Sequence, residues 1–273
     1  VARAMKIPDE VRRHPVGDGR TPIGAPGSWP RTLVIVPTYN EAANLKRLVA
    51  RIREACPFDL CVVDDGSPDG TGQLADRLAA DPANRMVVLH RAGRSGRGGA
   101  ILAGLRYGLA NDHEGCVEMD ADLSHLPEQV PELVAGLAEA GAVIGSRYEE
   151  GSRITGWPLR RRLFSRFANR FARSLLRVPG VSDYSNGFRA YGRPACSVIV
   201  ESELRETGYA ALAEWIVAIH RAGLSVRSIP IRFTDRTEGR SKTDMSEIVA
   251  TFRAVIRLWL ALRRGAARRE MRP

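Results

Sequence analysis

The sequence lacks any long apolar run. No stretch of its 273 residues approaches the roughly 20 uncharged apolar residues that a membrane-spanning helix needs. The first residues also lack the apolar segment of a secretory signal peptide. These absences predict a chain that does not itself span a membrane.

Cysteine is scarce, and acidic residues are outnumbered. The four cysteines lie far apart without the paired spacing of zinc or redox motifs, which excludes a disulfide-stapled miniprotein and favours a reducing, cytoplasmic setting. Lys and Arg total 41 against 31 Asp and Glu, a formal net charge of +10. Such a surplus indicates anionic partners, which include nucleic acid, phosphorylated substrates and an acidic membrane face.

The order of apolar patterns along the chain indicates an α/β protein. Residues 1–30 are dense in Pro and Gly, which predicts a flexible leader. From residue 31, short apolar runs alternate with helical patterns, as expected for a mostly parallel sheet flanked by helices. The predicted strands are 32–37, 60–63, 86–89, 116–119, 142–144 and 225–233, and the predicted helices begin at Glu41 and cover 73–80, 100–110, 127–140, 159–176, 209–221 and 244–264.

Polar segments follow three of the predicted strands. They are 37–41 (PTYNE), 64–71 (DDGSPDGT) and 120–125 (DADLSH). Ligands of open parallel sheets bind at the carboxyl ends of the strands, so these segments are expected to share one crevice. Acidic groups gathered there would repel one another unless a cation or hydrogen-bond donors occupied the space. The pattern therefore predicts a metal and nucleotide site.

Asp120 and Asp122 are the candidate metal ligands. Two carboxylates in an i, i+2 turn can bind one hard divalent cation that also bridges a diphosphate. Such a triplet is common by chance, but its place beside two other acidic strand ends favours metal binding. For Asp64 and Asp65 two interpretations stay open, since one of them can cap the following turn while the other binds ligand.

Five motifs together resemble a known enzyme family. Segments 36–41, 63–71, 119–125, 145–148 (GSRY) and 156–158 (GWP) resemble the family-2, GT-A fold glycosyltransferases and, more narrowly, the dolichol- or polyprenol-phosphate mannose synthases. The resemblance covers roughly residues 31–250 and implies a Rossmann-like GT-A catalytic domain at 31–242, followed at 243–273 by an amphipathic helix and a basic tail. It also implies transfer of mannose, with inversion, from GDP-mannose to a polyprenyl monophosphate.

The resemblance assigns roles to individual positions. Asp120 and Asp122 would hold Mg²⁺ or Mn²⁺ against the donor diphosphate. The segment 235–242 (DRTEGRSK) resembles a late family element that closes over phosphates. The implied donor-binding residues are Pro37, Tyr39, Glu41, Asp64, Asp65 and Asp120, the acceptor-phosphate residues are Arg147, Arg161, Ser241 and Lys242, and the catalytic residues are Asp122, Arg147, Arg236 and Lys242.

The sequence also departs from the family pattern. Segment 183–189 (DYSNGFR) stands where these synthases more often have Thr-Gly-Gly or Thr-Ser-Gly before Phe-Arg, and Leu212 stands where relatives tend to have Gln. Segment 93–99 (GRSGRGG) lacks the P-loop ending and is interpreted as a flexible turn into a helix. These departures leave open another donor, such as UDP-glucose, or a soluble acceptor.

Two basic amphipathic segments predict contact with an anionic surface. Residues 160–177 contain seven Arg and no acid, which favours anionic lipid headgroups or nucleic acid. The apolar stripe of 248–260 either packs on the core of the protein or lies among headgroups with Trp259 at the interface. A non-enzymatic adaptor is the remaining alternative, but clustered Asp120 and Asp122 argue against it. We expect peripheral association with the cytoplasmic membrane face, no nucleic acid, and a separate integral membrane protein as a candidate partner.

Overall fold

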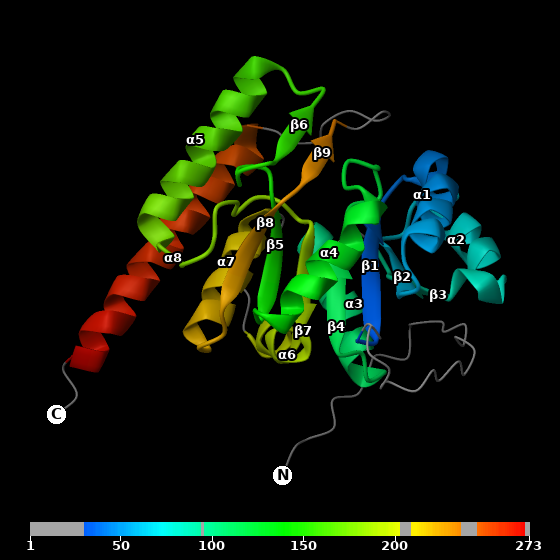
Figure 1. Cartoon of the computed structure of the whole chain (residues 1–273), viewed down its shortest axis with the longest axis horizontal. Helices are drawn as coiled ribbons and strands as arrows, with labels where there is room; N and C mark the ends of the chain where they lie inside the picture. The colour runs from blue at the N-terminus through cyan, green and yellow to red at the C-terminus, as the bar shows by residue number, and fades with distance from the viewer. Residues whose placement is uncertain (1–29, 94–95, 203–208, 236–244, 271–273) are drawn as a thin grey trace, which may run out of the picture.

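The molecule is built on a seven-stranded sheet in the order β3-β2-β1-β4-β7-β5-β8 (Figure 1). The computed structural model describes residues 30–93, 96–202, 209–235 and 245–270. The strands are β1 (Thr32–Thr38), β2 (Asp59–Asp64), β3 (Met86–His90), β4 (Gly115–Glu118), β5 (Ala142–Ser146), β7 (Arg189–Gly192) and β8 (Val226–Pro230), and a small second sheet pairs β6 (Arg153–Thr155) with β9 (Arg232–Thr234).

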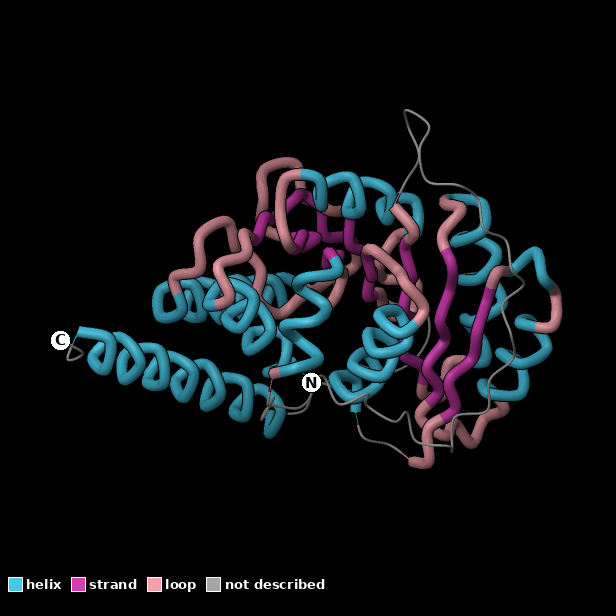
Figure 2. The backbone as a smooth tube through the Cα atoms, turned by 90° about the horizontal axis from the view of Figure 1, so that it is seen from below, coloured by secondary structure: helices cyan, strands magenta, loops and turns pink. Residues whose placement is uncertain are grey.

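Helices connect these strands and cover both faces of the large sheet, as Figure 2 shows. The helices are α1 (Ala42–Ala55), α2 (Thr71–Ala79), α3 (Gly96–Ala110), α4 (Val130–Ala135), α5 (Leu159–Leu176), α6 (Arg193–Glu201), α7 (Tyr209–Arg221) and α8 (Met245–Glu270), with 3-10 turns η1 (Pro82–Asn84), η2 (Pro127–Gln129) and η3 (Gly136–Ala138). None of the helices in the described part of the chain is long and apolar enough to cross a membrane.

Strand direction brings the predicted site segments to one edge. Strands β3, β2, β1 and β4 run parallel, and β5 runs parallel to β8. Strand β7 runs antiparallel to both β4 and β5, so β4 and β5 point the same way. The segments after β1, β2, β4 and β5 therefore leave the sheet at the same edge.

Alternating side chains of strand β1 pack into two apolar layers. Leu33 and Ile35 of β1 pack on the layer formed with α3, whereas Val34 and Val36 pack on the layer formed with α1. All four are buried, as expected for a parallel strand covered on both faces. The hydrogen-bonded pairing of β1 with β2 and β4 fixes its register and hence the place of the residues that follow it.

Helices α5 and α8 lie side by side at one end of the molecule (Figure 1). The Phe252 ring of α8 lies near the rings of Phe164, Phe167 and Phe171 of α5, with the Phe171 centroid 5.1 Å away. Val255 is buried and the half-buried Trp259 packs against the apolar core. The apolar stripe of 248–260 had two interpretations. At Val255 and Trp259 the structure agrees with packing on the protein's own core.

Several local expectations were wrong. The predicted strand 225–233 is two strands in different sheets, divided at Ile231. The predicted helix 127–140 is broken into η2, α4 and η3, and Pro131, the second residue of α4, lacks the N–H group that a continuous helix from Pro127 needs. Strands β6 and β7 and helix α6 were not predicted. The leader prediction falls on residues 1–29, outside the described residues.

Candidate functional site

The loops after β1 and β2 form one hydrogen-bonded unit. The buried carboxylate of Asp64 accepts hydrogen bonds from the Thr38 hydroxyl at 3.0 Å and from the Ser67 N–H at 3.1 Å. Of the two aspartates, Asp64 is therefore the one that caps the turn after β2. Asp65 instead pairs with the Arg91 guanidinium, with 2.6 Å between Oδ1 and Nη1. Asp65 thus sits beside a cation at the end of β2, a placement suited to holding a polar ligand.

The predicted donor residues of the first strand lie beside this unit. Pro37 and Tyr39 are half-buried at the carboxyl end of β1, where Pro37 is opposite Val63 of β2. The Glu41 N–H donates to the Thr71 hydroxyl at 2.9 Å, which ties the start of α1 to the start of α2. The structure therefore brings Pro37, Tyr39 and Glu41 together with the Asp64–Asp65 turn.

Asp120 follows β4 and lies against Arg97, the second residue of helix α3. Arg97 donates from Nε to Asp120 Oδ1 at 2.9 Å, from Nη1 to Glu118 Oε2 at 3.0 Å and from Nη2 to the Gly187 carbonyl at 3.0 Å. Glu118 is fully buried, so Arg97 compensates a charge that water does not reach. A side chain at position 187 would overlap the Arg97 guanidinium. Glycine at that position permits the contact.

Asp122 begins a tight, strained turn. Its Oδ1 accepts the Ser124 N–H at 3.1 Å, and the next residue, Leu123, has φ 61°. This left-handed backbone costs about 1–2 kcal/mol for a residue with a side chain. A second hydrogen bond, from the Thr234 N–H to the Ser124 carbonyl at 3.2 Å, holds the turn from β9. The loop that carries the two aspartates is therefore fixed in a conformation that its own backbone disfavours.

The two aspartates fit a cation that a bound diphosphate helps to hold. Among the described residues no group of three or more His, Cys, Asp or Glu side chains is arranged to hold a metal ion. Mg²⁺ and similar hard cations, however, often bind through one or two carboxylates, with substrate phosphates and waters as the other ligands. Asp120 and Asp122 match that donor set, and His125 adds no nitrogen because its Nδ1 accepts the Asp120 N–H at 3.0 Å.

On the other side of β7, Arg147 follows β5 and is held by Asp183. Arg147 Nε and Nη2 donate to the two Asp183 oxygens at 2.8 and 2.9 Å, and Nη2 also donates to the Ser185 hydroxyl at 2.7 Å. Burial alone would raise the pKa of Asp183, but the Arg147 guanidinium holds that pKa below its ordinary value. The pair is therefore charged, buried and rigid.

An aromatic platform joins Arg147 to Arg161. The Arg147 Cζ lies 5.2 Å from the Trp157 ring centroid, and the Arg161 Cζ lies 4.1 Å from it. Arg161 also pairs with Asp235 at 2.9 Å. The buried Trp157 indole N–H has no hydrogen-bond acceptor within the described structure. The remaining predicted residues, Arg236, Ser241 and Lys242, lie outside the described residues.

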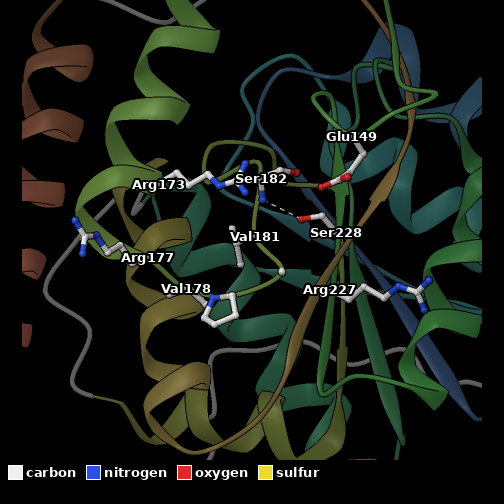
Figure 3. Close-up of a pocket in the computed structure, with 10 residues that line it drawn as sticks. Glu149, Arg173, Arg177, Val178, Val181, Ser182, Arg227 and Ser228 are labelled. Atoms are coloured by element: carbon white, nitrogen blue, oxygen red, sulfur yellow. Dashed lines mark hydrogen bonds between the residues drawn. The ribbon is translucent and has the colours of Figure 1, made fainter.

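A cavity of about 480 Å³ lies apart from this strand-end site (Figure 3). It opens between the C-terminal end of α5 and the edge strand β8, and three arginines and two serines contribute to its lining. Its ten described lining residues include none of the site residues predicted from the sequence. The site residues predicted from the sequence therefore lie apart from this cavity.

Sequence reasoning did not find several residues that complete the site. Arg91 and Arg97 contact predicted site carboxylates, yet segment 93–99 had been interpreted only as a turn. Their basic character just after a predicted strand was the available signal. Asp183 and Asn186 lie in the segment 183–189 that departs from the family pattern, but their contacts were not predicted, because their partners Arg147 and His125 lie far away along the chain.

The sequence is similar to those of two named bacterial proteins. The chain is 45% identical over 220 residues to the polyprenol monophosphomannose synthase of Mycolicibacterium smegmatis, an alignment that covers 80% of this chain and 83% of that protein. It is 40% identical over 214 residues to the undecaprenyl-phosphate mannosyltransferase of Micrococcus luteus, covering 78% of this chain and 87% of the relative.

Solved structures share the fold. A mannosyltransferase from Pyrobaculum calidifontis, in complex with GDP-Man and Mn²⁺, superposes with a TM-score of 0.59 at 22% identity, covering 85% of this chain and 65% of that one. This likeness confirms the predicted GT-A fold. Residues 33–199 match the family described as glycosyl transferase family 2. With that match over more than half of its length, the chain belongs to glycosyl transferase family 2.

Proposed function

We propose that this enzyme transfers mannose from GDP-mannose to a polyprenyl monophosphate at a membrane surface, with inversion, to give polyprenyl-phosphate mannose. The names of two relatives, at 45% and 40% identity, both specify mannose and a polyprenyl-type lipid phosphate. The GDP-Man complex of the Pyrobaculum mannosyltransferase supports the choice of donor.

The observation that carries the proposal is one aromatic cluster with carboxylates on one side and arginines on the other. Phe233 of β9 lies at its centre. The Phe233 ring centroid is 5.6 Å from that of His125, next to the Asp120 loop, and 5.5 Å from the Arg147 Cζ. The donor diphosphate and its cation would bind on the Asp120 side, and the acceptor phosphate on the Arg147 side. The sugar then lies between the two charged groups.

The residue types suit a displacement at the anomeric carbon. A lipid monophosphate is already ionised, so its oxygen attacks that carbon without a strong general base. The bond between the anomeric carbon and the diphosphate oxygen breaks, GDP leaves with the electron pair, and attack from the opposite face inverts the configuration. Mg²⁺ or Mn²⁺, when bound at Asp120 and Asp122, would neutralise charge on the departing diphosphate. Arg236 and Lys242 are proposed to close over the phosphates.

The acceptor phosphate is proposed to bind at the platform of Arg147, Trp157 and Arg161. The Trp157 indole N–H is a buried donor that lacks an acceptor, and a phosphate oxygen would supply one. The side chains of Leu159 and Leu163, on either side of Arg161 in sequence, are 69% and 59% exposed. These two leucines lie one helical turn apart on α5, and they are proposed as an apolar surface for the isoprenoid chain.

Helix α5 is proposed to bring the enzyme to the cytoplasmic face of the membrane. Besides the two leucines, its Phe164 and Phe167 side chains are exposed. Exposed apolar residues interspersed with arginines and no acidic residue fit an anionic lipid surface, where each arginine contributes about 1 kcal/mol. This placement puts the proposed acceptor site at the lipid surface.

The test is transfer of labelled mannose from GDP-mannose to a polyprenyl phosphate in detergent, with Mg²⁺ or Mn²⁺. We expect metal-dependent label in the lipid product for the wild type and a loss of at least about a hundredfold for Asp122→Ala, since oxygen-ligand contacts to the cation and leaving group are lost. Asp112→Ala, which removes an exposed aspartate at the far end of α3, is the matched control and keeps full activity. Transfer from UDP-glucose but not from GDP-mannose would contradict the proposed donor.

A further inference from the structure

A continuous chain of buried hydrogen bonds connects the two halves of the site. The Asp120 N–H donates to His125 Nδ1 at 3.0 Å, and His125 Nε2 lies 2.9 Å from Asn186 Oδ1. The backbone N–H of Asn186 donates to Asp183 Oδ1 at 3.1 Å, and Asp183 holds Arg147. All the intermediate side chains are buried. The chain therefore runs from the proposed cation ligand to the proposed acceptor arginine without a solvent gap.

The contacts fix the tautomer of His125 and the orientation of the Asn186 amide. Because Nδ1 of His125 accepts from the backbone of Asp120, its Nε2 must carry the proton and donate to Asn186 Oδ1. The amide orientation of Asn186 is thereby fixed, and its Nδ2 donates to the Gly145 carbonyl at 2.5 Å. Gly145 belongs to β5, and Arg147 directly follows that strand. Asn186 therefore also holds the strand that positions Arg147.

The backbone around Asn186 is itself braced. The buried Arg189 donates from Nε to the Asn186 carbonyl at 2.7 Å and from Nη2 to the Tyr184 carbonyl at 3.0 Å. The neighbouring Gly187 carbonyl accepts from Arg97, which also binds the Asp120 carboxylate. Asp120 is therefore held through its backbone by His125 and through its side chain by Arg97, and both contacts lead to residues 186 and 187.

We propose that Asn186 is a positioning residue that fixes the Asp120 loop relative to Arg147, so that binding of the divalent cation and binding of the acceptor phosphate depend on the same side chain. The inference rests on the proposed function, because it takes Asp120 as a cation ligand and Arg147 as an acceptor contact. Residues that orient metal ligands through hydrogen bonds commonly change metal affinity by 10- to 100-fold when removed.

The experiment measures two affinities in Asn186→Ala and Asn186→Ser. Free Mn²⁺, followed by its electron paramagnetic resonance signal in the presence of GDP, gives the Mn²⁺ Kd, and steady-state transfer gives the KM for polyprenyl phosphate. We expect both values to rise about tenfold in each variant. The affinity for GDP without metal stays unchanged, since the loops at Pro37 and Asp65 are not part of the chain. The serine variant keeps a polar group if the alanine variant does not fold.

The matched control is Asn84→Ala, the same substitution at a half-buried asparagine of η1 whose side chain donates to the Leu78 carbonyl. Unchanged Mn²⁺ Kd and KM in the folded Asn186 variants, or a shift in only one of them, would overturn the inference while leaving the proposed function intact. Failure of the wild type to bind Mn²⁺ with GDP would overturn the proposed cation site and the inference with it.

Discussion

At the scale of single residues, the indole N–H of Trp157 is an exception that calls for a ligand. Buried donors in proteins are nearly always hydrogen-bonded, and the ring that carries this one has the Cζ atoms of two arginines within 5.2 Å of its centroid. We predict that Trp157→Phe keeps the aromatic platform but raises the KM for polyprenyl phosphate by roughly 10- to 100-fold, because a hydrogen bond to a charged group contributes about 1.5–3 kcal/mol. Steady-state kinetics with varied acceptor measure the effect.

Trp215→Phe supplies the comparison for this prediction. Trp215 also has a buried indole N–H without an acceptor in the described structure, but it lies in the apolar core among residues such as Leu212 and Ile216. Its replacement should leave the acceptor KM unchanged. Equal KM values for Trp157→Phe and the wild type would remove Trp157 from the acceptor site.

At the scale of elements, helix α5 has one face on α8 and another open to solvent. Phe167 and Phe171 both lie near Phe252 of α8, but the side chains of Leu163 and Phe167 are still more than half exposed. We predict that the double variant Leu163→Ser and Phe167→Ser binds anionic vesicles at least about tenfold more weakly, since burial of one such side chain contributes about 1.5–3 kcal/mol. Vesicle co-sedimentation measures the partition coefficient.

The same variant should fold normally, because neither side chain is buried. Its kcat on a short-chain, water-soluble polyprenyl phosphate in detergent should match that of the wild type, because Leu163 is proposed to contact the isoprenoid chain and not the reacting groups. Unaltered vesicle binding would show that α5 does not carry the membrane contact.

The elements also show how far the sequence predicts this molecule. Helix α5 was predicted with its observed bounds, because its arginine and phenylalanine faces repeat with helical period. Strand β7 was missed, because four residues that include Arg189 and Gly192 give no alternating apolar pattern. In the site, Asp120 and Asp122 were predictable since they directly follow a strand. Asn186 was not, because its role depends on His125, 61 residues away along the chain.

At the scale of the whole molecule, the pH dependence of stability rests on buried carboxylates whose pKa values are lowered in the folded state. Burial alone would raise the pKa of Asp59, but hydrogen bonds from His113 and Arg85 hold that pKa below its ordinary value. Asp183 is shifted in the same direction by Arg147. A carboxyl with a lowered pKa in the folded state stabilises the fold above its unfolded-state pKa of about 4. This contribution is lost as the pH falls through the folded value.

We therefore predict that the free energy of unfolding stays nearly constant from pH 7 to pH 5 and falls steeply below about pH 4. Protonation of carboxylates there also increases a net charge that is already +10, and the added repulsion destabilises the compact state. Asp59→Asn should lower stability at pH 7 and flatten the decline, because its proton-linked contribution is gone. Urea unfolding at each pH measures both effects.

Asp112→Asn is the appropriate control, because its side chain is 88% exposed and pairs with Arg193 only at 3.7 Å. Exposed ion pairs contribute about 0–1 kcal/mol, so this variant should follow the wild-type curve at every pH. Asp59 lies at the start of β2, at the opposite end of that strand from Asp64, so its loss should not alter the acceptor KM. A decline below pH 4 that is equally steep in Asp59→Asn and the wild type would show that other carboxylates dominate the acid response.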